Sequence, residues 1–413
     1  MHIAFFTNTY NPWVSGVVRS ISSFRQSLSE LGHNVFIFAQ NVDDYVDEEP
    51  FIFRYPSLNF SWPTDFHAVI PISSFVDHLL PSLKLDVIHA HHPVLLGKAA
   101  ASKAAELDIP LVFTFHSQYT EYLQYLPLNQ ETIQDFIKEL IDSRLGDYME
   151  KCQHVVVPSI SMLELLQDVF GLKDRVSVVP TGIDTKRFST ADGQPIRVKH
   201  GWTNDIVLIS VGRLSPEKNW KTLLDACVPV IKKVQNFRVA IIGDGFERDK
   251  LEKYVKKLGI ADKVEFLRTI PYAEIPSYLK AADLFGFAST AETQGLVTME
   301  AVAAGLPVVA VDGVGTRDNV ENNRQGLLTP NNSEDLSKAI LTLVENPSLR
   351  AQFSTSATER SVEFDMSVQA EKLISVYHQA ISDHRAGKYV ILNRSKKISS
   401  LSNYIKQLTL QFD

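Results

Sequence analysis

The stretch LFGFASTAETQGLVTMEAVAAGLPVVAV, residues 284–311, decides the fold class of this chain. Its first apolar run, 284–288, predicts a buried strand, and 307–311 predicts a second one. Apolar residues at helical spacing predict a helix over 296–304, between the two strands. A strand, a helix and a parallel strand in succession form a βαβ unit, which indicates an α/β protein with a parallel sheet.

The same alternation of short apolar runs and amphipathic stretches continues on both sides of this segment. Further strands are predicted at 2–7, 34–39, 86–90, 111–115, 154–158, 176–180, 206–211, 237–242 and 264–267. Further helices are predicted at 16–31, 220–234, 248–258 and 273–281. Weak periodicity and turn residues over 181–205 predict a linker, after which the pattern restarts. The sequence therefore predicts two Rossmann-like, doubly wound domains, 1–185 and 186–365, facing across a cleft that suits a small-molecule ligand.

Composition excludes several classes of protein. The 413 residues are 45% hydrophobic and 22% charged, which is ordinary for a globular protein and excludes disorder as the main state. The net charge of −7 and the lack of a broad basic field argue against nucleic acid as a partner. Residues 1–180 hold 11 Lys and Arg against 21 Asp and Glu, which disfavours strong binding to anionic lipid. With no signal peptide or membrane span recognised, we expect a cytoplasmic protein.

Two cations follow the first predicted strand of the second domain. Arg213 ends that strand, and Lys218 stands at the predicted start of the next helix. Cations in these places suit a diphosphate, because they neutralise its charge and stabilise a departing nucleotide. Gly16, at the start of the first helix, would let backbone N–H groups approach a phosphate closely. The alternatives are two surface cations without a role and a glycine that merely forms a tight turn.

Two carboxylates lie eight residues apart in the segment that decides the fold. Glu292 falls in the predicted loop, and Glu300 falls in the predicted helix. Carboxylates bind sugar and ribose hydroxyls through charge-assisted hydrogen bonds, so the two can serve different parts of one ligand. Free N–H groups at the helix start would point into the cleft. We therefore include the residues between the carboxylates in the predicted ligand site, namely Thr293, Gln294, Gly295 and Leu296.

Histidines follow two strands of the first domain. His116 comes at the carboxyl end of the strand 111–115, which is a cleft position, although a core histidine is the alternative. His89, His91 and His92 suggest a metal site, but adjacent histidines cannot all converge on one ion, so we predict none. The chain also has no Asp-x-Asp triplet, a carboxylate motif that can hold a metal ion.

These motifs together resemble the retaining glycosyltransferases of family 4, which have the two-domain architecture called GT-B. The resemblance runs from residue 1 to about residue 385, and the Glu-x7-Glu segment is its most specific part. It implies that Glu292 binds the donor sugar hydroxyls and Glu300 binds the ribose. It also implies that Arg213 and Lys218 bind the donor diphosphate. The family's loop glycine and active-site histidine match Gly16 and His116.

Glu292-Thr-Gln-Gly-Leu, taken with His116-x-x-Tyr119, is similar to the diacylglycerol glucosyltransferase subgroup. The resemblance implies a metal-independent enzyme that moves a hexose, with retained configuration, to a lipid, lipid-linked or polysaccharide-precursor acceptor. It implies glucose from UDP-glucose as the donor and no cofactor besides this substrate. The alternatives are a nucleotide-sugar epimerase on the same architecture and a sugar-nucleotide-binding module without catalysis.

Three further features complete the expectations. Gly243-Asp-Gly245 begins like a dinucleotide fingerprint, but Arg248 replaces the third glycine, which disfavours an NAD enzyme. Arg268 stands where the family often has a glycine after the third strand of the second domain. Residues 43–81, rich in acidic and aromatic side chains, are expected to shape the acceptor site unless the aromatics simply pack in the core.

The end of the chain also offers two interpretations. Residues 394–412 carry apolar side chains on one helical face, with lysines nearby. This pattern predicts either a helix lying on a membrane surface or one that packs back on the protein. We expect the helices of about 366–413 to pack on the first domain, and peripheral association with the inner membrane face stays open.

Overall fold

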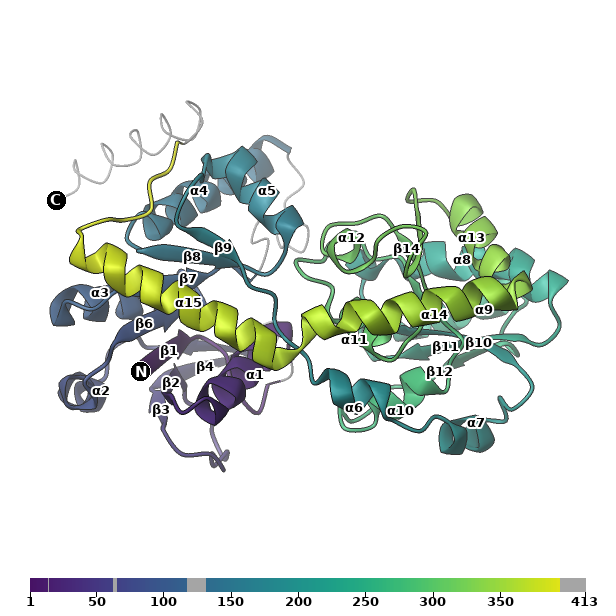
Figure 1. Cartoon of the computed structure of the whole chain (residues 1–413), viewed down its shortest axis with the longest axis horizontal. Helices are drawn as coiled ribbons and strands as arrows, with labels where there is room; N and C mark the ends of the chain where they lie inside the picture. Colours follow the sequence, from purple (N-terminus) through teal and green to yellow (C-terminus); the bar gives the residue numbers. More distant parts are fainter. Residues whose placement is uncertain (14, 62–64, 117–130, 394–413) are drawn as a thin grey trace. The chain divides into compact units, whose positions relative to one another are not determined.

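A computed structural model describes residues 1–13, 15–61, 65–116 and 131–393 (Figure 1). The chain divides into two compact units. Unit 1 comprises Met1–Thr181 together with Gln369–Asp413, and unit 2 comprises Gly182–Val368. The domains predicted from the sequence were 1–185 and 186–365, with the C-terminal helices returning to the first.

Unit 1 is built on a parallel sheet. Its strands are β1 (His2–Thr7), β2 (Asn34–Gln40), β3 (Ile52–Tyr55), β6 (Val87–Ala90), β7 (Leu111–Thr114), β8 (His154–Val157) and β9 (Val176–Val178). They lie in the order β3-β2-β1-β6-β7-β8-β9. An antiparallel hairpin, β4 (Ser57–Ser61) and β5 (Asp65–Val69), follows β3. The helices are α1 (Gly16–Glu30), α2 (Ser74–Leu79), α3 (Leu96–Leu107), α4 (Glu131–Met149), α5 (Ile160–Phe170) and α15 (Met366–Arg385).

Helix α15 completes the core of unit 1. Its buried residues pack with those of α1 on one face of the sheet, and Figure 1 shows the helix lying across the strands. The Tyr377 hydroxyl is hydrogen-bonded to His89 Nδ1 at 2.8 Å, and His89 Nε2 is 2.7 Å from Thr114 Oγ1. All three side chains are buried. Residues from opposite ends of the chain therefore share one hydrogen-bonded core.

Unit 2 repeats the architecture. Its strands are β10 (Ile206–Val211), β11 (Phe237–Ile242), β12 (Val264–Phe266), β13 (Leu284–Phe287), β14 (Val308–Val311) and β15 (Gly326–Thr329), in the order β12-β11-β10-β13-β14-β15. Its helices are α6 (Thr185–Ser189), α7 (Gln194–His200), α8 (Trp220–Lys233), α9 (Arg248–Leu258), α10 (Ile275–Lys280), α11 (Leu296–Ala303), α12 (Thr316–Asn319), α13 (Ser333–Glu345) and α14 (Pro347–Ser361).

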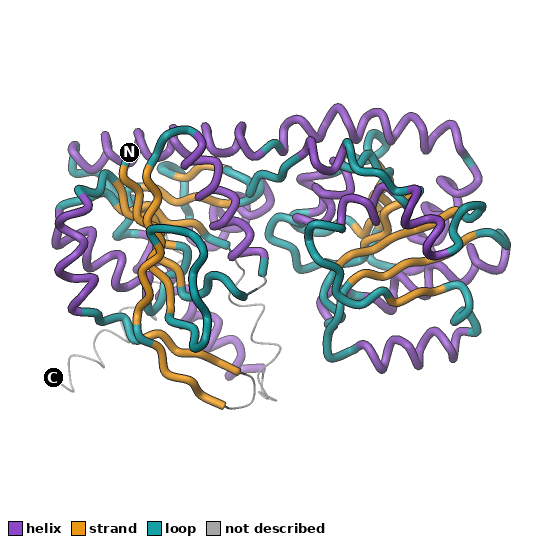
Figure 2. The backbone as a smooth tube through the Cα atoms, turned by 90° about the horizontal axis from the view of Figure 1, so that it is seen from below, coloured by secondary structure: helices purple, strands orange, loops and turns teal. Residues whose placement is uncertain are grey.

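Helices cover both faces of the unit 2 sheet, as Figure 2 shows. Leu208 and Ile241 face a cluster with α8, α9 and α13. The neighbouring positions, Val207 and Ile242, face a second cluster with α6, α10 and α11. Because a strand buried on both sides is apolar at every position, these strands stand out in the sequence as continuous apolar runs.

The prediction of a linker over 181–205 is wrong. These residues form α6 and α7, and Ile183 forms a parallel bridge with Asp365. Phe188 and Trp202 are fully buried in a core cluster of unit 2. The glycines of this segment suggested a flexible connection. In the structure Gly193 and Gly201 are instead the cap residues at the two ends of α7.

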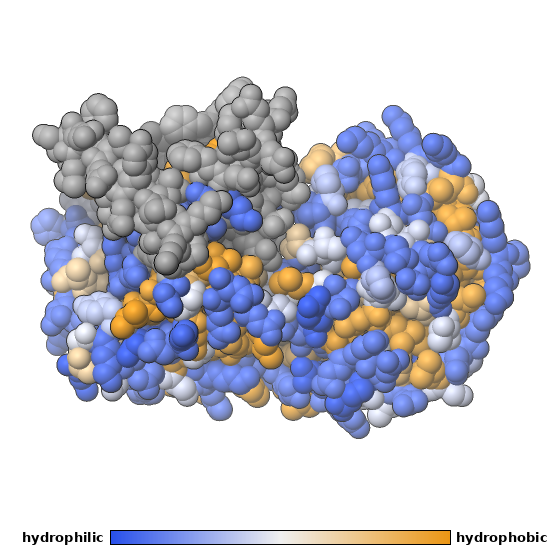
Figure 3. All heavy atoms as spheres, turned by 90° about the horizontal axis from the view of Figure 1, so that it is seen from above, coloured by the Kyte–Doolittle hydropathy of each residue, from blue (hydrophilic) through white to orange (hydrophobic). Residues whose placement is uncertain are grey.

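No helix in the described ranges combines the length and the apolar content needed to cross a membrane. Figure 3 shows hydrophobic side chains interspersed with hydrophilic ones on the visible face. The tail over 394–412 lies outside the described residues. In the predicted acceptor region 43–81, Trp62 also lies outside them, and the side chains of Phe60 and Phe66 are not described.

Replacing Trp202 by alanine tests whether this segment belongs to the core. We expect Trp202→Ala to lower the free energy of unfolding by about 3–5 kcal/mol, because a large buried ring is lost. Val198→Ala, at a side chain that is 71% exposed on α7, should change it by less than about 0.5 kcal/mol. Urea denaturation followed by circular dichroism measures the free energy of unfolding of both variants. If Trp202→Ala changed it as little as Val198→Ala, the segment would not belong to the core.

Candidate active site

The candidate site of unit 2 lies at the carboxyl edge of its sheet. Strands β10 and β13 are neighbours in the sheet. The chain adds β11 and β12 on the β10 side and β14 and β15 on the β13 side, so the strand order reverses between β10 and β13. Arg213 and Lys218 follow β10, and Glu292 follows β13. In open α/β sheets such a reversal leaves a crevice outside the strand ends, where ligands bind. The fold thus brings together residues that are far apart in the sequence.

Lys218 and Glu292 form an ion pair across this point. Their side chains are 19% and 14% exposed, so the pair is largely shielded from solvent. Arg213 is exposed, and no carboxylate among the described residues pairs with it. One cation of the predicted diphosphate site is therefore free, and the other is held by the carboxylate predicted to bind the sugar.

The turn that carries Lys218 is fixed by backbone and side-chain contacts. Pro216–Lys218 forms a short 3₁₀ turn, and Asn219 takes the left-handed conformation at φ 54° before α8 begins. The Asn219 side chain donates to the Ala288 carbonyl at 3.2 Å, which ties the turn to the end of β13. The prediction that Lys218 opens a helix is wrong, because α8 begins at Trp220. Asn tolerates the left-handed conformation that separates the two elements.

The Gly-Asp-Gly motif supports the same turn. A Cβ at Gly243 would lie 1.9 Å from the Gly212 carbonyl oxygen, and one at Gly245 would lie 2.4 Å from the Leu214 carbonyl oxygen. Leu214 N–H donates to the Asp244 carbonyl at 3.0 Å. The absence of a side chain at these glycines lets the loop after β11 pack directly against the backbone beside Arg213.

The loop before α11 is held in place from a third segment. Gly295 adopts φ 71° as the N-cap of α11, and Thr298 and Met299 N–H donate to its carbonyl. The buried Asn319 side chain donates to the carbonyls of Gln294 and Gly295, at 2.6 and 3.1 Å. The N–H groups of Leu296 and Val297 are the remaining donors of this first turn.

The other predicted residues of this segment differ in exposure. Thr293 and Leu296 are partly exposed, whereas Gln294 is buried, its side-chain amide 2.9 Å from the Met299 sulfur. Glu300 lies inside α11 and is only 1% exposed. The structure thus brings the predicted donor-binding residues to one edge of the sheet, with Glu300 beneath the surface rather than on it.

Unit 1 holds the remaining predicted residues. Gly16 is exposed at the start of α1, where the Ser15 hydroxyl caps the helix by accepting from Val18 N–H at 3.2 Å. His116 follows β7 and is partly buried. Its Nε2 lies 2.9 Å from His91 Nδ1, and the two rings stack. Tyr119 lies outside the described residues.

Four histidines near the ends of β6 and β7, namely His89, His91, His92 and His116, are held neutral by burial. Burial lowers the pKa of His89 to about 3 and that of His92 to about 4. Burial, reinforced by neighbouring histidines, also lowers the pKa values of His91 and His116 well below the usual range. His116 therefore acts as a hydrogen-bonding group rather than a cation at neutral pH. Within the described part of the chain, no group of His, Cys, Asp and Glu side chains is placed to hold a metal ion.

The sequence analysis missed two residues that support the site. His91 contacts His116, but in the sequence its only signal was a place just after a strand. Asn319 fixes the loop before α11 from a distant segment, and nothing in the local sequence indicated this. Both act through tertiary contacts that hydrophobic periodicity does not report.

Arg268, which replaces a frequent family glycine, takes the left-handed conformation at φ 58°. Its carbonyl accepts from Gly243 N–H at 2.8 Å, so the residue closes the loop behind the Gly-Asp-Gly motif. The position keeps the backbone shape that favours glycine although its side chain is long.

Two family models match the chain, one in each half. The model for glycosyltransferase family 4 matches residues 14–187, and the model for glycosyl transferases group 1 matches residues 192–360. The alpha-monoglucosyldiacylglycerol synthase of Streptococcus pneumoniae is 34% identical over 75% of this chain and 71% of its own length. A synthase of the same name from Acholeplasma laidlawii is 29% identical over 91% of this chain and 96% of its own.

The fold has solved counterparts as well. Anabaena Alr3699/HepE, crystallised with UDP and glucose, superposes with a TM-score of 0.72 at 21% identity, covering 92% of this chain and 99% of the other. The two Rossmann-like sheets and this structural likeness show the GT-B fold. The chain belongs to glycosyltransferase family 4 and is a glycosyltransferase.

Two glycines in left-handed conformations provide a matched test of the loop packing. Gly315 (φ +75°) would place a Cβ 2.9 Å from the backbone of Gln294, whereas Gly259 (φ +71°) has open space around it. We expect Gly259→Ala to lower the free energy of unfolding by about 1 kcal/mol through backbone strain alone. Gly315→Ala should lower it by clearly more, because backbone atoms must also move. Equal losses in urea denaturation would contradict the packing described here.

The neutral histidines predict a pH dependence of stability. Unfolded histidine takes up a proton near pH 6.5, whereas folded His89 stays neutral down to about pH 3. The unfolded state therefore binds more protons in this window, and the free energy of unfolding should fall as the pH drops through it. In His89→Gln the slope should be smaller by up to about 1.4 kcal/mol per pH unit. Urea denaturation at several pH values measures the slope, with the exposed His78→Gln as control, and an unchanged slope in His89→Gln would refute the assignment.

Proposed function

We propose that this protein transfers glucose from UDP-glucose to a diacylglycerol lipid, with retention of the anomeric configuration. The Lys218–Glu292 ion pair beside the free Arg213 carries the proposal, because it joins diphosphate-binding and sugar-binding groups at one point. Two relatives named as glucosyldiacylglycerol synthases support the lipid acceptor and the glucosyl group. The UDP and glucose bound to a protein of the same fold support the donor.

The ion pair explains how the donor enters. The diphosphate binds the free Arg213 and draws Lys218 away from Glu292, because the diphosphate carries two negative charges and the carboxylate carries one. The released Glu292 carboxylate then accepts hydrogen bonds from the hydroxyls of the sugar. Donor binding thus exchanges one ion pair for several charge-assisted contacts, so little charge is left unpaired in the site at any stage.

The cations then act on the leaving group. As the bond between sugar and phosphate breaks, negative charge grows on UDP, and Lys218 and Arg213 stabilise it. The N–H groups of the first turn of α11 carry partial positive charge, and in this scheme they add to the stabilisation. The acceptor hydroxyl attacks from the face that the phosphate leaves, and the phosphate takes its proton. No carboxylate has to form a covalent intermediate in this scheme.

His116 and Gly16 are the contributions of unit 1. A neutral His116 orients hydroxyl groups of the sugar or the acceptor by hydrogen bonding. Gly16 leaves the first N–H groups of α1 accessible to a phosphate. A lipid acceptor requires the enzyme to work at a membrane surface, so we include peripheral association with the inner membrane face in the proposal. None of the relatives described above is named as an epimerase.

Removing the Lys218 ammonium tests the proposed role directly. We expect Lys218→Ala to lower kcat at least tenfold, since about 1.4 kcal/mol or more of leaving-group stabilisation is lost. Lys338→Ala, which removes a lysine from an exposed ion pair on α13, should leave kcat unchanged. The measurement is radiolabelled glucose transfer from UDP-glucose to diacylglycerol, with circular dichroism to verify folding. Near-normal turnover of folded Lys218→Ala would refute the diphosphate role.

A further inference from the structure

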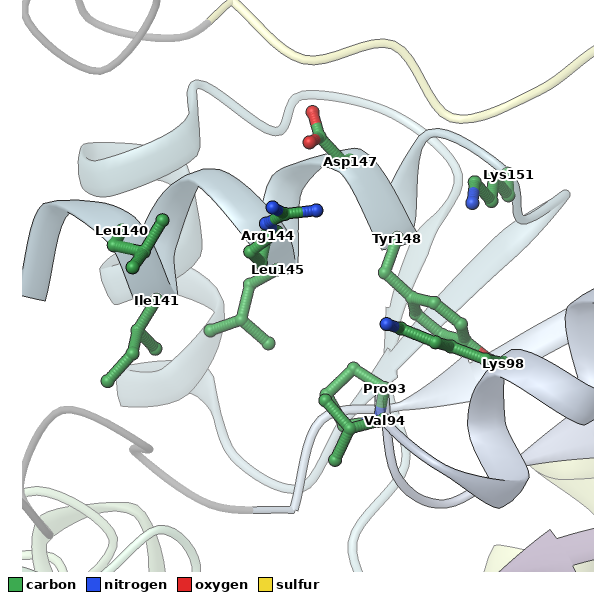
Figure 4. Close-up of a pocket in the computed structure, with 10 residues that line it drawn as sticks. All are labelled: Pro93, Val94, Lys98, Leu140, Ile141, Arg144, Leu145, Asp147, Tyr148 and Lys151. Atoms are coloured by element: carbon green, nitrogen blue, oxygen red, sulfur yellow. The ribbon is translucent and has the colours of Figure 1, made fainter. Parts of the chain in front are cut away.

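A cavity of about 610 Å³ lies within unit 1, and none of its lining residues belongs to the candidate site described above. Helix α4 forms one wall, and the start of α3 with the loop before it forms the other (Figure 4). It is lined by Pro93, Val94, Lys98, Leu140, Ile141, Arg144, Leu145, Asp147, Tyr148 and Lys151. Its volume falls in the range of small-molecule sites, which is about 300–1,000 Å³.

The interior of this cavity is apolar. Leu140, Ile141 and Leu145 come from α4, and Pro93 and Val94 face them from the loop. Tyr148 is buried, and its hydroxyl donates to the Gly97 carbonyl at 2.9 Å, so its polar end is satisfied within the protein. Water gains few hydrogen bonds in such surroundings, whereas an alkyl chain gains the burial of its surface.

The charged residues that line the cavity are three cations, Lys98, Arg144 and Lys151, and one carboxylate, Asp147, so its rim is cationic on balance. Lys98, Arg144 and Lys151 are exposed, and none of them forms an ion pair with any residue that the structure describes. Lysine and arginine side chains can only donate hydrogen bonds, so this rim suits a ligand whose polar part carries oxygen acceptors. An alkyl chain joined to an ester meets both requirements.

The cavity is connected to the sheet edge that holds His116. Pro93 directly follows His92, whose Nδ1 accepts from Asn8 N–H at 3.2 Å. The Asn8 side chain also donates to the Val94 carbonyl at 3.2 Å. One wall of the cavity is thereby fixed to the ends of β1 and β6, next to the strand that His116 follows. The side of the cavity formed by Pro93 and Val94 therefore lies at that edge.

We propose that this cavity takes one acyl chain of the glycerolipid acceptor, with its ester carbonyl oxygen at the cationic rim. The inference rests on the proposed function and names the side chains that recognise its acceptor. It separates the roles within unit 1: the apolar wall of α4 selects the length of the chain, and the rim selects the ester.

Filling the cavity is the first test. Ile141→Trp places a larger side chain in it, and Ile160→Trp makes the same change at an exposed position of α5 as a control. Acceptor KM is measured with diacylglycerols of increasing chain length. In the wild type each added methylene should lower KM about fourfold until the cavity is full. Ile141→Trp should raise the KM for dioctanoylglycerol at least tenfold and flatten this trend, while kcat and the KM for UDP-glucose stay unchanged.

Removing a rim cation is the second test. Arg144→Ala should raise KM several-fold for ester-linked diacylglycerol and leave it unchanged for the ether-linked analogue, which has no carbonyl oxygen. Lys173→Ala, at an exposed lysine of unit 1 outside the cavity, serves as the control. Equal effects on ester and ether lipids would overturn the role of the rim.

Binding without turnover separates this inference from the proposed function. Calorimetry with dioctanoylglycerol alone should show binding to the wild type and tenfold weaker binding to Ile141→Trp, even if no diacylglycerol proves to be a substrate. Unchanged binding and KM in Ile141→Trp would overturn the assignment. A second result would also overturn it: Ile141→Trp weakens the binding of dioctanoylphosphatidylglycerol but leaves the KM for the diacylglycerol acceptor unchanged. The cavity would then hold a membrane lipid rather than the acceptor.

Discussion

The ion pair between Lys218 and Glu292 is the interaction on which the candidate site depends. Two opposite charges largely shielded from solvent cost desolvation energy, which their mutual attraction and hydrogen bonding must offset. A protein of this fold could avoid that cost with apolar side chains at the same positions. We propose that the pair is kept because a ligand needs both charges, and the nearby Arg213 supports an anionic ligand.

The rest of unit 2 holds these charges in place. The pair joins the loops after β10 and β13, and Asn219 ties the same two loops together through the Ala288 carbonyl. Gly243 allows the loop after β11 to support the backbone at Gly212 from behind. Asn319 fixes the third side of the site. Contacts from several strands thus converge on one edge, which is what a preorganised site for a charged ligand requires.

The hydrophobic pattern predicted the central strands of both sheets well and several of the edge strands poorly. The strands 2–7, 206–211 and 237–242 have the predicted bounds, because strands covered by helices on both faces must be apolar throughout. The edge strands β3 and β15 were missed because each is short and partly exposed. The segment 181–205 was mistaken for a linker because glycines that cap a helix look locally like glycines of a flexible loop.

The sequence allowed us to name candidate site residues, but not to predict which of their side chains contact one another. Motif spacing and family resemblance indicated Arg213, Lys218, Glu292 and His116. They did not reveal that Lys218 and Glu292 contact each other, or that His91 contacts His116. Both contacts join distant segments through side chains, and their formation depends on tertiary packing that local sequence does not encode.

A crystal structure with bound UDP-glucose, or a non-hydrolysable analogue of it, tests the central claim most directly. The account predicts the diphosphate within hydrogen-bond distance of the Lys218 ammonium and the Arg213 guanidinium, with Glu292 turned to the sugar hydroxyls and its ion pair broken. A diphosphate bound elsewhere, with the Lys218–Glu292 pair still intact, would contradict it.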